Sequence, residues 1–401
     1  MLIQIFLSLF FGTIAGTFAG LAPGIHINLI GVLLVTLSAS TLSFVHPIYL
    51  VVFVVAMAIT QTFVDFIPGI FLGCPDTDTE LSVLPGHELL KEGEGYQAIL
   101  LTAYGCLTAI ILLLIITYPL ILLVSWTYKA IESLIPYILI LISVILILME
   151  SKRINATLVF VLTGILGVCI LNLPESILKQ PLLPLLTGLF GSSMLIMSIK
   201  NKTKIPEQKI IKPKLTKESI RPILGALIAS PLCGFLPGLG SGQAAVIGNT
   251  ISNTKDNKKN FLILLGATNA LVMGFSFISL YTISKTRTGA ALTIKQVLGE
   301  MNPQILILIL GMIIISGIIS FFLTDFLAKF FSQKINKINY SLLSIATIVL
   351  LFVVILFVSG FFGIIVLLIS TMTGIFCISL CVRRTNMMAC ILLPVILWYL
   401  F

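Results

Sequence analysis

Two short segments interrupt long apolar runs of this chain: GLAPGIHINLIG at residues 20–31 and GFLPGLGSGQAAVIG at residues 234–248. Both contain the pattern Gly-x-x-Pro-Gly. Proline removes a backbone amide donor and glycine permits a reversed backbone, so each motif is expected to break a helix. Within hydrocarbon, the freed backbone groups survive only beside protein or in a wet cavity. The motifs therefore predict two polar interruptions inside a membrane protein.

The composition also requires a membrane location. The chain is 58% hydrophobic and only 10% charged, and its mean hydropathy is +1.16. A soluble domain has about 25% charged residues. The apolar runs approach or exceed the ~20 residues of a spanning helix and do not alternate with polar residues. We expect an all-α integral membrane protein, with spans that include residues 98–126, 137–149, 261–283, 304–323 and 342–358.

The basic residues predict how the chain is oriented. The net charge of +9 comes from lysines and arginines in short loops between spans, which is typical of cytoplasmic loops and does not indicate nucleic-acid binding. One long polar stretch, residues 200–221, divides the chain near its midpoint. We predict a first repeat at 1–199, a basic cytoplasmic linker at 200–221 that contacts anionic membrane lipid, and a second repeat at 222–401.

The loop charges predict that the two halves are inverted. Each half is expected to hold one Pro-Gly-broken helical hairpin and about five further membrane crossings. Because the number of crossings in the first half is odd, the second half begins on the opposite side of the membrane and is inverted relative to the first. Inverted repeats with broken helices are typical of secondary transporters, which bind substrate where the repeats meet.

Broken helices can bind ions at their exposed ends. Half-helix N-termini favour anions, and free carbonyl groups favour cations. The alternative is that glycine, proline and small polar residues only kink and pack helices. The predicted substrate-binding residues are Pro23, Gly24, His26, Asn28, Pro237, Gly238, Gly240, Ser241, Gly242, Gln243, Asn249 and Arg287.

A second pair of elements lies deeper in each half. Residues 66–98 contain two Pro-Gly pairs around a stretch too short and polar to span, which predicts a re-entrant or interfacial hairpin. Its counterpart is SKTRTGAALTIKQVLGE at 284–300. Within it, Arg287 can hold a carboxylate or phosphate in two hydrogen bonds, or it can extend to lipid head groups.

Several polar residues are candidates for ion binding. Asp65 and Asn269 are the candidates for ion coupling, because Asp65 is an acidic group inside an apolar run. Asp76, Asp78 and Glu80 can bind a divalent cation or cap a helix, and capping is the more common role. The cysteines lack disulfide or zinc spacing, and no metal site or catalytic residue is predicted.

Four segments resemble the successive motifs of one transporter family. They are GTIAGTFAGLAPGIHINLIG, FIPGIFLGCPDTDTELSVLPGHELLKEGEGYQA, GFLPGLGSGQAAVIGNT and SKTRTGAA. The likeness is to the TctA family, the large membrane subunit of tripartite tricarboxylate transporters, and particularly to its short stand-alone prokaryotic and archaeal relatives. It implies a plasma-membrane permease driven by Na⁺ or H⁺, with its substrate region at the paired Pro-Gly motifs. It also implies a small membrane subunit and a binding protein as partners.

Three functions are compatible with these features. The first is an ion-coupled transporter for a small organic anion such as a carboxylate, acting as a monomer or a homodimer without a bound cofactor. The second is a translocase for a polyprenyl phosphate or another lipid-linked anion, which would use the same arginine. The third is an intramembrane enzyme, for which no nucleophile-base pair is evident.

Overall fold

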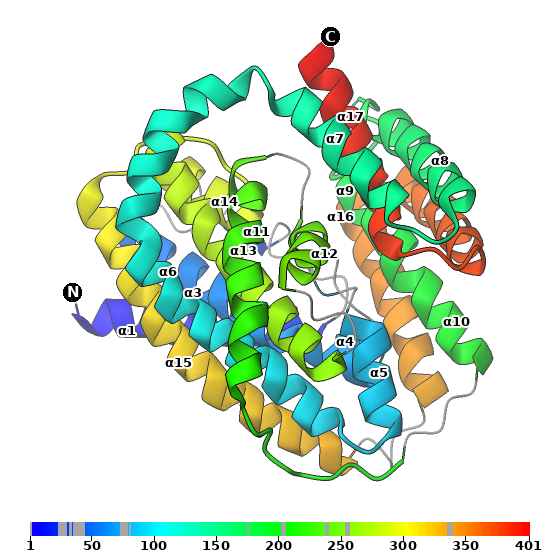
Figure 1. Ribbon diagram of the computed structural model, residues 1–401, viewed down its shortest axis with the longest axis horizontal. Helices are drawn as coiled ribbons and strands as arrows, with labels where there is room; N and C mark the ends of the chain where they lie inside the picture. The colour runs from blue at the N-terminus through cyan, green and yellow to red at the C-terminus, as the bar shows by residue number, and fades with distance from the viewer. Residues whose placement is uncertain are drawn as a thin grey trace.

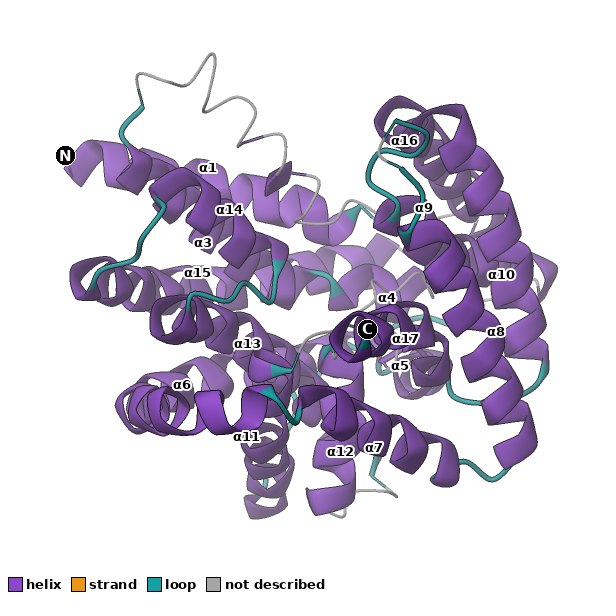
Figure 2. Ribbon diagram, turned by 90° about the horizontal axis from the view of Figure 1, so that it is seen from above, coloured by secondary structure: helices purple, strands orange, loops and turns teal. Residues whose placement is uncertain are grey.

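The computed structural model describes residues 2–22, 30–31, 34, 45–72, 79, 82–174, 176–201, 206–236, 240–252, 257–334 and 340–401. Within these residues the chain forms helices and no strand (Figures 1 and 2). The helices of the first half are α1 (Leu2–Leu21), α3 (Pro47–Val64), α4 (Phe66–Leu72), α5 (Val83–Lys91), α6 (Gly95–Glu132), α7 (Ile135–Leu148), α8 (Arg153–Leu171), α9 (Leu182–Leu186), the π-helical turn η2 (Thr187–Ser192) and α10 (Ser193–Asn201). Those of the second half are η3 (Lys217–Ser219), α11 (Ile220–Phe235), α12 (Ser241–Ser252), α13 (Lys258–Ile283), α14 (Gly289–Leu298), α15 (Pro303–Lys334), α16 (Tyr340–Ser379), η5 (Arg384–Met388) and α17 (Ala389–Leu400).

Among the described residues, seven helical spans are long and apolar enough to cross a membrane. They lie at Leu2–Leu21, Pro47–Phe71, Gly95–Trp126, Arg153–Leu171, Lys258–Ile283, Pro303–Lys334 and Ser344–Ser379. The prediction of an all-α, multi-pass membrane protein is confirmed. The span predicted at 304–323 is longer than expected, because α15 continues to Lys334. Asp325 stays inside this helix because Lys329 pairs with it at 2.7 Å and the Tyr96 hydroxyl donates to it at 2.6 Å.

The element α16 is a hairpin of two helices. Gly360 has φ 72° and ψ −166°, a conformation that glycine adopts readily and that ends the first helix. A Cβ added at Gly363 would lie 3.2 Å from Cγ2 of Ile355, although positions eight residues apart in a straight helix are about 12 Å apart. The chain therefore folds back on itself within α16, and the apolar run predicted at 342–358 forms the first arm of this hairpin.

Helices α3 and α13 form the centre of the molecule (Figure 1). Their most apolar windows are 94% and 89% buried, whereas those of the other five spans are 28–39% buried. Around them α1 packs on α3, α11 packs on α13, α15 packs on α3, and α6 packs on α13. The backbones of α6 and α13 approach closely, because a Cβ at Gly266 would overlap the carbonyl oxygen of Thr102.

The direction of these helices follows from their contacts. Helix α6 runs antiparallel to α15, since Tyr96 contacts Asp325 and a Cβ at Gly317 would meet Ile110. It runs parallel to α13, since Gly266 abuts Thr102 and Gly274 abuts Leu113. Helix α3 is in turn parallel to α15: Ala56 shares a cluster with Met312, and Ser320 donates to Thr60 at 2.9 Å. The two central helices α3 and α13 therefore point in opposite directions.

A peripheral bundle lies to one side of the centre. It consists of α7, α8, α9, η2, α10, α16, η5 and α17, which pack mainly on one another. Figures 1 and 2 show α8, α10 and α16 on the side of the molecule away from α1 and α15. Helices α8 and α17 touch through Gly167, where a Cβ would overlap the carbonyl oxygen of Cys390.

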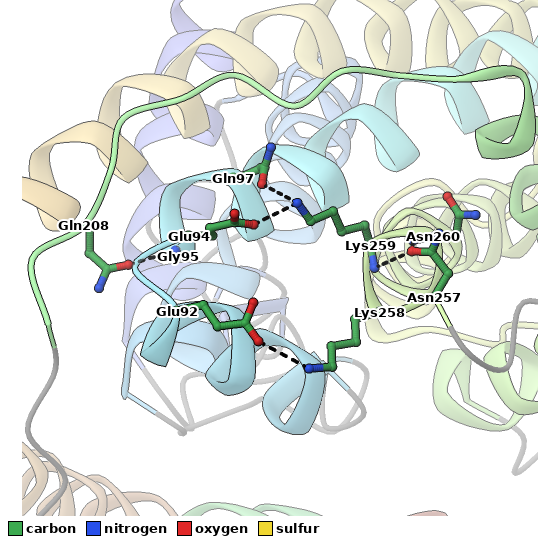
Figure 3. Close-up of polar contacts among 9 residues, drawn as sticks. All are labelled: Glu92, Glu94, Gly95, Gln97, Gln208, Asn257, Lys258, Lys259 and Asn260. Carbon is green, nitrogen blue, oxygen red and sulfur yellow. Dashed lines mark hydrogen bonds and ion pairs between the residues drawn. The ribbon is translucent and has the colours of Figure 1, made fainter.

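Part of the linker between the halves is held against the turn between α5 and α6 (Figure 3). Gln208 accepts a hydrogen bond from the Gly95 amide at 2.8 Å, and the Lys209 amide donates to the Gly93 carbonyl at 2.7 Å. The start of α13 meets the same turn, where Lys258 pairs with Glu88 and Lys259 pairs with Glu94, both at 2.8 Å. The linker and these two lysines therefore share one end of the molecule.

Candidate functional site

Part of the predicted site lies outside the described residues. This holds for Pro23, Gly24, His26 and Asn28 of the first motif, for Pro237 and Gly238 of the second, and for the acidic residues Asp76, Asp78 and Glu80. The helices that flank the motifs are described. Helix α1 ends at Leu21, α11 ends at Phe235 and α12 begins at Ser241.

The second motif lies at the tip of a short helical hairpin. Helices α11 and α12 are antiparallel, because Gly225 abuts Gly248 near the open end and the Cys233 thiol contacts the Gly240 carbonyl at 3.1 Å near the tip. They have 16 and 12 residues, or about 24 and 18 Å. Neither reaches the ~30 Å of a hydrocarbon core.

Polar groups cluster at this tip. Oε1 of Gln243 accepts a hydrogen bond from the Gly240 amide at 2.9 Å, while its Nε2 is buried without a hydrogen-bond partner among the described residues. Ser241 and Gly242 are buried in the first turn of α12. Asn249 is partly buried, about 12 Å further along the helix axis, and so does not lie at the tip.

Asp65 and Asn269, predicted separately from the two halves, contact each other. Asp65 lies at the junction of α3 and α4, and it is only 5% exposed. Nδ2 of Asn269 donates to Oδ2 of Asp65 at 3.1 Å and to the Thr62 carbonyl at 3.3 Å. The first motif is close by, because a Cβ at Gly20 would lie 3.1 Å from the Asp65 amide. The end of α1, the junction of α3 and α4, and the middle of α13 therefore meet here.

Arg287 precedes helix α14 in the chain. Its Nε and Nη2 atoms are buried and have no hydrogen-bond partner among the described residues. These two atoms form one edge of the guanidinium group, with the fork geometry that matches the two oxygens of a carboxylate. Thr288 caps α14, since its hydroxyl accepts from the Ala291 amide at 3.3 Å. The backbone amides in the first turn of α14 point toward its N-terminal end, which follows Arg287 in the chain, and their partial positive charge favours an anion.

Helix α14 is shared with the first half of the chain. It packs on α3, and a Cβ at Gly31, the last residue of the 20–31 segment, would overlap the Thr293 hydroxyl. Helix α14, which follows Arg287, is therefore in contact with Gly31 of the first half.

One face of α13 joins these parts. Asn269 contacts Asp65, the Ser276 hydroxyl lies 2.8 Å from the Thr288 hydroxyl, and Ser279 donates to the Gly234 carbonyl at 2.6 Å. Positions seven and ten residues apart lie on nearly the same helix face, here over about 15 Å. The α11–α12 hairpin, Asp65 and the Arg287 loop are thus arranged along a single buried helix.

Sequence reasoning missed Ser276, Ser279 and Thr62. The first two repeat at helical spacing from Asn269 within an apolar run, and this pattern could have identified them. Thr62 contributes a backbone carbonyl, for which the sequence carries no signal.

The predicted hairpin at 66–98 consists of two short helices, α4 and α5, that pack together. The Pro-Gly pairs at 68–69 and 85–86 lie in the first turns of these helices. Backbone amides in a first turn have no partner within the helix, so proline there costs no helical hydrogen bond. On α5, burial first, and then the charges of Lys91 and Arg384, lower the pKa of His87 to about 4. Arg384 belongs to η5, so the central region and the peripheral bundle approach each other here.

Within the part of the chain that the structure describes, no three His, Cys, Asp or Glu side chains gather as a metal ion would require.

The model of the Tripartite tricarboxylate transporter TctA family matches residues 6–389, nearly the whole chain. The chain belongs to the TctA family. It is also 31% identical over 402 residues to the uncharacterized protein MJ1079 of Methanocaldococcus jannaschii, with 98% of each chain covered. No solved structure matches the chain significantly. The family is one of transporters, so this TctA-family chain is a transporter-type membrane subunit, and the resemblance found in its motifs is confirmed.

Proposed function

We propose that this protein is a secondary transporter for a small organic anion, most suitably a carboxylate, driven by a cation gradient. The observation that carries the proposal is Arg287, whose Nε and Nη2 edge is buried without a hydrogen-bond partner in the described structure. A buried charged donor is costly unless an anion or acceptor satisfies it. A substrate carboxylate can accept both hydrogen bonds at once.

The surroundings of Arg287 suit an anion that must be released again. The amides of the first turn of α14 add a partial positive charge, and Thr288 is held by Ser276 of the central helix. Gln243, at the tip of the α11–α12 hairpin, has a buried amide nitrogen without a partner in the described structure and is proposed as a further donor to substrate. These groups come from separate elements, so their relative movement can open and close a site.

The helix directions support two inverted repeats, at 1–199 and 222–401. Helix α1 packs on α3 as α11 packs on α13, and α15 packs on α3 as α6 packs on α13. If α3 corresponds to α13 and α6 to α15, then the packed pair α3–α15 corresponds to the packed pair α13–α6. The two pairs run in opposite directions. That is the relation expected of inverted repeats, which place substrate between halves that rock against each other.

The family description, a tripartite tricarboxylate transporter, supports a carboxylate as substrate. We propose di- or tricarboxylates as the substrate class, the plasma membrane as the location and the 200–221 linker on the cytoplasmic side. The tripartite partners in that description, a binding protein and a small subunit, extend to this chain only as a proposal.

Uptake by proteoliposomes containing the purified protein tests this function. Radiolabelled mono-, di- and tricarboxylates are offered under imposed pH and Na⁺ gradients. Arg287→Ala should abolish uptake, and Arg287→Lys should lower it strongly because an ammonium group cannot form the two-pronged bond. Arg153→Ala, at an exposed arginine of the peripheral bundle, is the matched control and should transport normally.

Two results would redirect the proposal. Normal carboxylate uptake by a folded Arg287→Ala protein would remove the arginine from the site. Absence of carboxylate uptake together with translocation of a fluorescent polyprenyl phosphate would favour the lipid-linked anion, because a phosphate binds the same guanidinium edge.

A further inference from the structure

We infer that Asp65 is the proton-binding site that couples this transporter to a pH gradient, and that Asn269 is its positioning residue. The inference rests on the proposed function and names its driving ion. It starts from a contact between the halves: an amide on α13 donates to a carboxylate at the junction of α3 and α4.

The location of Asp65 makes a purely structural role costly. The carboxyl group is 5% exposed and belongs to the most deeply buried span of the described structure. An acidic side chain within a membrane span is expensive in its charged form and is found mainly on ion or proton pathways. Its position beside Gly20 places it next to the first broken motif.

The orientation of Asn269 favours a proton over Na⁺. The atom of Asn269 nearest to Asp65 also lies 3.3 Å from the Thr62 carbonyl, which can only accept a hydrogen bond. This atom is therefore the amide nitrogen of Asn269. It is a hydrogen-bond donor placed between Oδ2 of Asp65 and the Thr62 carbonyl oxygen, the two oxygens that a sodium ion would need as ligands. The carboxyl group itself can bind a proton without further ligands.

Other titratable groups lie on the neighbouring helices. Cys106 of α6 is within the electrostatic reach of Asp65, and its thiol donates to the Thr62 and Gly266 carbonyls at 3.5 and 3.2 Å. The remaining groups on elements packed against α3 and α4 include Tyr104 of α6, His87 of α5, Asp325 and Lys329 of α15, Lys295 of α14 and Arg287 just before it. The helix residues of α1 and α4 include none.

Protonation of Asp65 would favour substrate binding through charge. Asn269 and Ser276 lie seven residues apart on one face of α13, or about 10 Å, and Ser276 holds the Thr288 hydroxyl beside Arg287. At about 10 Å and an effective dielectric constant of about 20, removing one negative charge strengthens binding of a monovalent anion by about 10-fold. A dianion gains more. Proton and substrate would then bind together and be released together.

Transport assays separate the proton step from substrate binding. Wild-type proteoliposomes should accumulate carboxylate under a pH gradient and not under a Na⁺ gradient. Asp65→Asn imitates the protonated residue, so it should lose accumulation but keep exchange of internal for external substrate. If Asp65→Asn exchanges substrate without accumulating it, the proposed transport function stands. If the wild-type protein neither accumulates nor exchanges a carboxylate, the proposed transport function itself is wrong.

The pH profile of substrate accumulation tests the positioning role of Asn269. Asn269→Ala removes a donor to the charged carboxylate and should move the pH of half-maximal accumulation upward by about one unit. Thr371→Val, at a buried hydroxyl of the peripheral bundle, is the control and should keep the wild-type profile. Accumulation by Asp65→Asn, or accumulation driven by Na⁺ in the wild type, would overturn the inference.

Infrared spectroscopy tests the inference without any substrate. Acidification of the reconstituted protein should produce the carbonyl band of a protonated, buried carboxyl group. The band should be missing from Asp65→Asn and present in Asp325→Asn, whose carboxyl group pairs with Lys329. If Asp65→Asn retains the full band, Asp65 is not the proton site, whatever the substrate proves to be.

Discussion

The central helices α3 and α13 differ from the peripheral helix α8 in burial and in where several of their polar groups bond, although Asn155 of α8 also donates to the Leu380 carbonyl of another element. On α8, the hydroxyls of Thr157 and Thr163 donate to carbonyls four residues earlier in the same helix. In the centre, Asn269 and Ser279 donate to other elements. In the most apolar 18-residue stretch of each span, 94% of the residues are buried for the α3 span and 89% for α13, against 33% for α8.

The difference teaches how one apolar composition supports two roles. A hydroxyl that bonds to its own helix lets that helix face lipid without an unsatisfied group. A polar group that bonds to a neighbouring element makes the arrangement of the two elements part of its stability. The centre can therefore respond to a ligand, and the peripheral bundle can serve as a frame.

The largest effect is expected where α6 packs on the central helix α13. Gly266→Ala places a methyl group against the Thr102 carbonyl, and α6 and α13 must separate to accept it. Such overpacking costs on the order of 3 kcal/mol. Thermal unfolding in detergent measures the loss. Gly311→Ala is the control, because nothing lies within 4 Å of a Cβ there. Because alanine has a higher helix propensity than glycine, Gly311→Ala should be as stable as the wild type or slightly more stable. If Gly266→Ala were as stable as Gly311→Ala, the close packing of α6 on α13 would be contradicted.

A smaller effect is expected at His87, where the two regions approach. Its pKa falls from 6.5 to about 4 in the folded protein, so the unfolded chain binds more protons between these values. The free energy of unfolding should therefore decrease as the pH falls from about 6.5 toward 4, by at most about 3 kcal/mol. His87→Gln should flatten this part of the profile, measured as melting temperature against pH. The same slope in variant and wild type would assign the pH dependence to other groups.

The smallest effect on stability is expected at Ser279, which ties α13 to the broken hairpin. Ser279→Ala leaves the Gly234 carbonyl without this donor and should cost about 1 kcal/mol. Because Gly234 precedes the hairpin tip, uptake should also fall. Thr163→Val removes a buried hydroxyl of α8 and should cost a similar amount of stability without a change in uptake. A parallel loss of uptake in both variants would erase the distinction between centre and frame.

Much of the fold could be predicted from the sequence because membrane spans depend on local composition. Apolar runs located most of the long spans, whereas the run predicted to span at 137–149 forms α7, which has only 14 residues and is not among the seven long spans. The end of α11 before the second Pro-Gly motif follows from the chemistry of proline and glycine. The extension of α15 past residue 323 could not be predicted, because Asp325 is tolerated only through its pairing with Tyr96 and Lys329. The sequence reveals a charged residue but not its distant partner.

The candidate site shows the same limit. Asp65, Asn269 and Arg287 stood out as polar residues in apolar surroundings, and the structure brings Asp65 and Asn269 within 3.1 Å. The contact between Ser276 and Thr288 depends on how α14 folds back on α13. Likewise, the approach of Arg384 to His87 joins residues almost 300 positions apart in the chain. Such contacts arise from packing, which no local pattern encodes.

Equilibrium binding to the purified protein tests the central claim most directly, since it needs neither a gradient nor partner subunits. Titration calorimetry compares a di- or tricarboxylate with its uncharged amide on wild type, Arg287→Lys and Arg153→Ala. We predict that wild type and Arg153→Ala bind the carboxylate and not the amide, and that Arg287→Lys binds it at least 10-fold more weakly, as the loss of one charge-assisted hydrogen bond requires. Equal affinity of Arg287→Lys and wild type for the carboxylate would contradict the account.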